Sequence, residues 1–103
     1  MECCRFISKD NINQILINQL VRSATSIGAN YSEADEAVSN RDFVNKLAIA
    51  KKEAKETKYW LHLLAKTIPN KIEVARSLWQ EANELTKILA SIINNSKSRK
   101  NGY

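Results

Sequence analysis

The stretch that decides the fold is FVNKLAIAKKEAKETKYWLHLL, residues 43–64. Its apolar and small side chains recur at alternating spacings of four and three, the heptad pattern of a helix that packs against other helices. This core stripe consists of Phe43, Leu47, Ala50, Ala54, Thr57, Leu61 and Leu64. Ser39 followed by Asp42 is typical of a capped helix start, and Pro69 ends a helix. We therefore expect a helix over residues 40–67.

Helical patterns continue on both sides of this stretch. Upstream, apolar residues recur three and four apart, among them Leu20, Ile27 and Val38, and predict a core stripe on a helix over about residues 10–38. Downstream, a similar stripe that includes Leu78 and Leu85, with Arg76 on the opposite polar face, predicts a helix over about residues 70–95. A basic tail follows at residues 96–103. Two glycines and one proline in 103 residues are too few for the turns of a sheet protein. We predict one all-α domain, an antiparallel up-down bundle with three long helices.

The composition limits the kinds of partner and compartment. Sixteen Lys and Arg against eleven Asp and Glu give a net charge of +5, which favours an acidic partner such as nucleic acid. Cys3 and Cys4 are adjacent, so they cannot join distant elements and lack the spaced partners of a zinc site. No stretch approaches the length of a membrane span or an export signal. We predict a cytoplasmic protein with reduced cysteines and no membrane association.

Few residues are suited to catalysis. His62 is the single histidine, and the sequence has no Gly-rich phosphate loop and no metal-binding spacing. Glu33, Asp35 and Glu36 cluster near the end of the first helix, but adjacent helical side chains diverge, so solvated surface is favoured over a cation site. A hydrolase or nuclease that uses this cluster is the least favoured class. We expect no catalytic residue, no metal and no cofactor, and hence no enzyme.

A basic face on the central helix is the most informative polar pattern. Offsets of four, three, four and four bring five side chains to one face, called here the lysine stripe: Lys51, Lys55, Lys58, His62 and Lys66. Like charges four residues apart oppose helix formation, so folding alone does not call for this arrangement. RNA or DNA phosphates would neutralise it without sequence readout. A solvated lysine face is the competing interpretation.

The same helix is apolar over a wider arc than one core stripe requires. The additional residues are Ile49, Tyr59, Trp60 and Leu63. They either lean over the edge of the core or form an interface with a second subunit or a partner. Tyr59, Trp60 and Trp79 could also stack on unpaired bases, but aromatic residues at helical spacing are more often core or interface. Arg22, among small residues of the first helix, predicts an ion pair with Glu53 or Glu56.

Several segments together resemble a known family. They are LVRSATSIGAN at residues 20–30, Arg41-Asp42-Phe43, KLAIA at 46–50, KEAKE at 52–56, Tyr59-Trp60-Leu61, and residues 84–92. This pattern resembles the small bacterial four-helix-bundle proteins encoded by intervening sequences within 23S ribosomal RNA genes. The resemblance covers about residues 15–95. We expect the family's first helix to be short or missing in this sequence, because residues 1–10 are too few to form it. A truncated chain, a start site placed too far downstream and a compensating partner are the alternatives.

The resemblance implies a four-helix bundle that associates as a homopentameric barrel. The family includes accessory proteins of diversity-generating retroelements, which bind nucleic acid and a reverse transcriptase through a basic surface. It implies structural roles, and no catalytic ones, for the positions that match: Arg22, Asn30, Glu33, Asp42, Phe43, Glu53 and Glu56.

Two hypotheses follow from the sequence. The first is a non-enzymatic homo-oligomer that binds nucleic acid, with RNA favoured, through the lysine stripe. The alternative is an adaptor that docks a larger enzyme, such as a reverse transcriptase, through the apolar face of the central helix. Salt dependence separates them, because phosphate binding weakens steeply with added salt whereas apolar docking does not.

Overall fold

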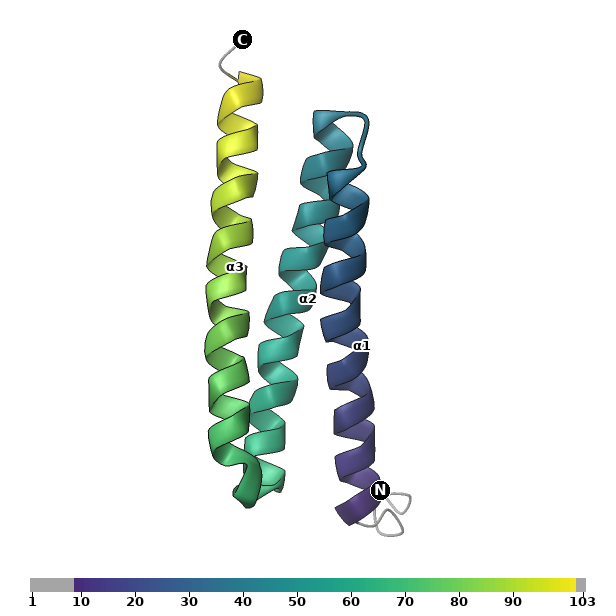
Figure 1. The fold of residues 1–103 in the computed structure, drawn as a ribbon, viewed down its shortest axis with the longest axis vertical. Coiled ribbons are helices and arrows are strands. Elements are labelled where there is room, and N and C mark those ends of the chain that lie inside the picture. Colours follow the sequence, from purple (N-terminus) through teal and green to yellow (C-terminus); the bar gives the residue numbers. More distant parts are fainter. Residues whose placement is uncertain (1–8, 102–103) are drawn as a thin grey trace, which may run out of the picture.

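The computed structural model describes residues 9–101, which form three long helices (Figure 1). They are α1 (Lys9–Asp35), α2 (Asn40–Thr67) and α3 (Ile72–Asn101), and a short 3-10 turn, η2 (Pro69–Lys71), joins the last two. The prediction of an all-α bundle is thereby confirmed. Cys3 and Cys4 lie outside the described residues.

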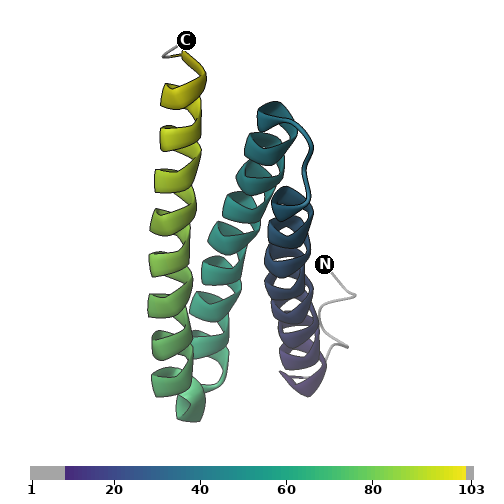
Figure 2. The ribbon, with the colours of Figure 1, turned by 45° about the horizontal axis from the view of Figure 1, so that its top comes forward.

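The central helix α2 packs closely against both others. Within the described residues α1 lies along one side of α2 and α3 along the other, and no Cα atoms of α1 and α3 come within 8 Å of each other. Side chains of all three helices still share one core cluster, which includes Ala34, Leu47 and Leu89. The three helices accordingly stand side by side with α2 in the middle in both views (Figures 1 and 2). This arrangement leaves an apolar furrow between the two outer helices, called here the α1/α3 groove. It encloses about 320 Å³.

The first turn explains why α1 is shorter than predicted. Ser39 caps α2 from an extended backbone, and its hydroxyl accepts a hydrogen bond of 3.1 Å from the Asp42 backbone N–H. The predicted cap is therefore confirmed. The residues that lead into this cap, 36–38, leave the helical conformation because the cap residue itself is extended, so α1 ends at Asp35 instead of Val38. Val38, placed on the core stripe by its spacing, is 98% exposed.

The second connection is built around Pro69. The Ile68 N–H donates to the Leu64 carbonyl, 2.9 Å away, and closes α2. Pro69 then opens the 3-10 turn, so α3 begins at Ile72 and not at residue 70. At its far end α3 continues to Asn101 and includes part of the segment predicted to be a tail. No glycine or proline interrupts residues 72–101, so nothing in this polar stretch breaks the helix.

Small side chains allow α2 to lie close to its neighbours. Ala50 and Ala54 are fully buried, and Leu47, Leu61 and Leu89 are the large side chains buried beside them. Two hydroxyls share this interior: Thr57 Oγ1 lies 2.9 Å from Ser23 Oγ and 2.8 Å from the Glu53 carbonyl oxygen. Of the helices within residues 9–101, none has the combination of length and apolar character that crossing a membrane requires.

Candidate nucleic-acid interface

The lysine stripe lies along the flank of α2 that faces α3. Heptad spacing turns Leu47 and Ala54 into the core, and positions one residue or four residues later fall beside α3. Lys55, His62 and Lys66 are exposed, and Lys51 and Lys58 are half-buried. The five residues thus share one flank, but they are not equally accessible.

Lys58 differs from the other members of the stripe. Its ammonium donates a 3.1 Å hydrogen bond to Asn83 Oδ1 on α3 and lies 5.3 Å from the centroid of the Trp79 ring. A cation above an indole ring is attracted by the ring electrons, so Lys58 helps to join α2 to α3. The sequence pattern treated it as equivalent to its neighbours because the contact depends on α3.

Four cations on this flank have no partner among the described side chains. They are Lys51, Lys55 and Lys66 of α2 and Arg76 of α3, called here the free cations, and none makes an ion pair or a side-chain hydrogen bond. The nearest acidic residues on the central helix, Glu53 and Glu56, are turned toward α1. The flank therefore presents positive charge that the fold itself does not neutralise.

The α1 side of α2 carries charges that do neutralise one another. Arg22 forms ion pairs with Glu53, at 3.4 Å, and with Glu56, and its Nε donates to Gln19 Oε1 at 3.1 Å. The predicted ion pair is confirmed with both carboxylates, although the Arg22 side chain is 47% exposed and not buried. The Trp60 indole N–H donates to Glu56 Oε1 at 3.1 Å, and this bond, together with Arg22, lowers the pKa of Glu56.

A second ion pair joins α1 to α2 near the first turn. Lys46 Nζ lies 2.6 Å from Glu33 Oε2, and this hydrogen-bonded carboxylate raises the pKa of Lys46. Glu33 thus faces a lysine, and in the described part of the chain no three metal-ligating side chains gather in one place. Asn30 donates to the Ser26 carbonyl of its own helix at 2.9 Å.

The apolar arc of α2 is partly exposed. Ile49 is 41% and Tyr59 56% exposed, whereas Trp60 and Leu63 are half-buried. The Tyr59 and Trp60 rings meet edge to face with centroids 5.1 Å apart. Trp60 therefore shares the Glu56 carboxylate with Arg22, and Ile49 and Tyr59 are the exposed members of this arc.

The α1/α3 groove exposes apolar residues that their spacing assigned to the core. Leu78 and Leu85 of α3, and Leu20 and Ile27 of α1, line the α1/α3 groove, and Leu78 is 42% exposed. Among the described helices, the backbone of each outer helix packs closely only against α2. The spacing of apolar residues predicts which face of a helix is buried, but it does not show which neighbouring helix covers that face.

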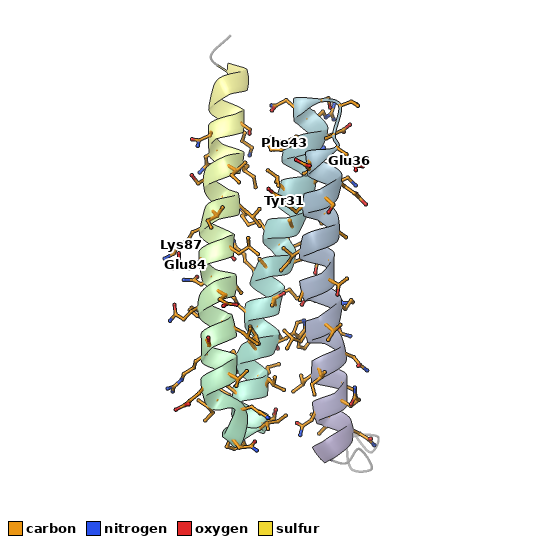
Figure 3. The ribbon with its side chains drawn as sticks, viewed as in Figure 1. Tyr31, Glu36, Phe43, Glu84 and Lys87 are labelled. Carbon is orange, nitrogen blue, oxygen red and sulfur yellow. The ribbon has the colours of Figure 1, made fainter. Side chains whose placement is uncertain are left out.

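A cavity of about 530 Å³ continues the basic flank between α2 and α3, near the turn that joins them. We call it the Trp79 pocket. Its apolar lining comes from Leu61, Ala65, Ile72, Ala75 and Trp79, and its polar lining from His62, Lys66, Arg76 and Gln80. Arg76 was predicted on the polar face of its helix, but its approach to His62 and Lys66 was not predicted. The antiparallel turn between α2 and α3 brings these side chains together, and spacing within one helix does not show it. Glu84 and Lys87, farther along α3, project away from α2 (Figure 3).

Comparisons with known proteins identify the family and a similar fold. Residues 2–91 match the family model described as 23S rRNA-intervening sequence protein. A similar solved structure is the crystal structure of a protein with unknown function from the S23 ribosomal protein family of Bacteroides thetaiotaomicron. It is 49% identical, with 78% of this chain and 71% of that chain covered and a TM-score of 0.74. No curated protein matches the chain significantly.

Proposed function

The chain belongs to the family of 23S rRNA-intervening sequence proteins, and we propose that it is a cytoplasmic, non-enzymatic protein that binds RNA. The free cations and the exposed members of the lysine stripe contact phosphates of the RNA backbone. Contacts of this kind release counterions and add affinity without reading sequence.

The observation that supports the proposal is the different state of the charges on the two sides of α2. On the side facing α1, Arg22 forms ion pairs with Glu53 and Glu56. On the flank facing α3, the free cations have no acidic partner among the described residues. A helix optimised only for stability would interleave carboxylates with Lys51, Lys55 and Lys66, since like charges four apart are unfavourable. Unneutralised cations along one flank, extended onto α3 by Arg76, suit a polyanion.

We further propose that the chain acts as a homo-oligomer. Apolar side chains remain exposed on the arc of α2, at Ile49 and Tyr59, and in the α1/α3 groove, at Leu78. Self-association would cover them and would repeat the basic flank in each subunit. Repeated modest sites raise avidity without new contacts. The pentamer implied by the family resemblance is one such assembly.

The exposed Ile49 and Tyr59 also favour the second candidate, an adaptor that docks a larger enzyme, such as a reverse transcriptase, through this apolar arc. Replacing Tyr59 by Ser separates the two. An adaptor loses its partner in this variant, whereas an RNA-binding protein keeps its affinity for a short RNA that a single subunit can hold.

The first experiment is light scattering during size exclusion, recorded at 260 and 280 nm, on protein purified without nuclease. The proposal predicts several 11.7 kDa chains per particle with excess absorbance at 260 nm. A clean monomer free of RNA contradicts the proposed oligomer and favours the adaptor.

A matched pair of double variants then tests the surface. Lys55→Glu with Lys66→Glu reverses two exposed cations of the flank, and Arg41→Glu with Lys87→Glu lowers the net charge equally elsewhere. Arg41 lies about 21 Å from Lys55 along α2, at about 1.5 Å per residue, and Lys87 points away from α2 (Figure 3). We expect RNA affinity to fall at least about tenfold in the first variant only. Equal losses in both variants would show a diffuse charge effect and refute the assigned surface.

A further inference from the structure

The Trp79 pocket combines two features that the phosphate contacts proposed above do not use. Its interior is apolar and includes the indole of Trp79, and its polar lining includes Lys66 and Arg76, with no carboxylate among the lining residues. Its volume of about 530 Å³ lies in the range of small-ligand sites, about 300–1,000 Å³. The occupant that fits must pair a flat or apolar group with a negative charge.

The tryptophan in this pocket is held in place before any ligand arrives. Lys58 Nζ lies 5.3 Å from the ring centroid and is itself fixed by its hydrogen bond to Asn83 on α3. Trp79 is half-buried and lines the cavity as well as contacting Lys58. A ring that is already ordered loses little side-chain entropy when a second ring stacks on it.

The pocket also lies on the proposed path of the RNA backbone. His62 and Lys66 belong to the lysine stripe and line the cavity, and Arg76 approaches it from α3. A phosphate held by Lys66 and Arg76 would therefore place the attached nucleotide at the opening. Stacking of a base on an aromatic side chain tolerates any base identity, as phosphate binding does.

We propose that the Trp79 pocket receives one unpaired nucleotide of the bound RNA, with the base against Trp79 and the phosphate at Lys66 and Arg76. This inference rests on the proposed RNA binding and specifies its substrate as single-stranded or bulged RNA. A duplex keeps its bases stacked and would have to extrude one, at a cost in free energy, before the pocket could be filled.

Fluorescence of Trp79 reports directly on occupancy. Trp60 and Trp79 are the two tryptophans, and Trp60 lies on the α1 side of α2, so a Trp60→Phe variant leaves one emitter in the pocket. Titration with uridine 5′-monophosphate should quench this emission, and uridine or inorganic phosphate alone should quench it less at equal concentration. Equal quenching by phosphate alone would overturn base stacking.

Filling the cavity separates the pocket from the flank. Ala65 lines the pocket, and an Ala65→Met substitution occupies it without changing charge, with methionine a good helix former. We expect the variant to lose the quenching and at least about fivefold in affinity for a single-stranded 12-nucleotide RNA, the lower end of what one stacked base supplies. Affinity for a duplex of the same length should be unchanged.

A second variant, Arg76→Gln, tests the pocket independently in case Ala65→Met does not fold. Arg76 is exposed, so Arg76→Gln removes a charge without touching the core, and it should weaken quenching by the monophosphate severalfold but not by uridine. If Ala65→Met keeps full preference for the single strand while Lys55→Glu with Lys66→Glu loses RNA, the pocket is refuted and the RNA surface stands. If the unaltered protein binds neither RNA at low salt, both proposals fail.

Discussion

The two sides of α2 use charge in opposite ways. Toward α1, Arg22 and Lys46 are paired with carboxylates, and the Ser23 and Thr57 hydroxyls are joined in the interior. Toward α3, Lys58 is attached to Asn83 and Trp79, and the free cations beside it have no acidic partner in the described structure. Charge on the first side serves the fold, and charge on the second is available to a ligand.

Added salt should distinguish the two sides most strongly. If the four free cations each contact a phosphate, single-strand theory predicts a roughly 50-fold loss of RNA affinity between 50 and 200 mM salt. The melting temperature of the free protein should change little, because exposed ion pairs such as those of Arg22 contribute modestly. Fluorescence anisotropy and thermal melts over the same salt series measure both, and a salt-independent affinity would contradict phosphate binding.

The buried hydroxyl pair should give the next largest effect, and on stability alone. In Thr57→Val the Ser23 hydroxyl loses its buried neighbour, and we expect about 1–2 kcal/mol less free energy of unfolding. Combining it with Ser23→Ala should cost less than the two single changes together, because the hydrogen bond between the two hydroxyls can be lost only once. Urea denaturation of the four proteins in this cycle measures the coupling, and strict additivity would show that the hydroxyls do not interact.

Removing the exposed ion pairs should have a smaller effect. Arg22→Gln leaves Glu53 and Glu56 without their cation, and we expect a loss of about 1 kcal/mol. RNA affinity should stay within about twofold, because Arg22 lies on the side facing α1 and the flank of free cations is untouched. A large loss of RNA binding in this folded variant would extend the interface across α2 and erase the distinction between its sides.

Acid should produce the smallest change, through Glu56. Its pKa in the folded protein is lowered, chiefly by the Trp60 hydrogen bond and then by Arg22, so the ionised form adds stability above its ordinary pKa of 4.5. That contribution is lost as the pH falls from 4.5 through the lower folded-state value. Glu56→Gln should therefore lose less stability than the unaltered protein over this interval. Urea melts at pH 6 and pH 3 compare them, and equal losses would contradict the shift.

Periodicity predicted the elements of this fold because each is decided locally. The heptads around Leu47 and Leu61, the Ser39 cap and the Pro69 break are all readable from neighbouring residues. Two predicted helix ends were wrong. The first helix ends at Asp35 and not at Val38, because the turn before the Ser39 cap is not helical. The last helix continues to Asn101, because no residue in its polar end breaks it.

The candidate site was predicted only as far as one helix can show it. The face that holds Lys55 and Lys66 follows from spacing on α2, but the contact between Lys58 and Trp79 and the approach of Arg76 depend on how α3 returns along α2. The exposed groove residues, Leu78 among them, were assigned to the core because an apolar stripe does not reveal which of its neighbours is present.

The separation of α1 from α3 also bears on how the chain folds. Among the described helices, close backbone packing joins only helices that follow one another in sequence, α1 with α2 and α2 with α3. Closing such hairpins requires only short loops, and topologies with low contact order fold in microseconds to milliseconds. Either hairpin can form without waiting for the third helix. A nascent chain can therefore acquire its α1–α2 hairpin while α3 is still being synthesised.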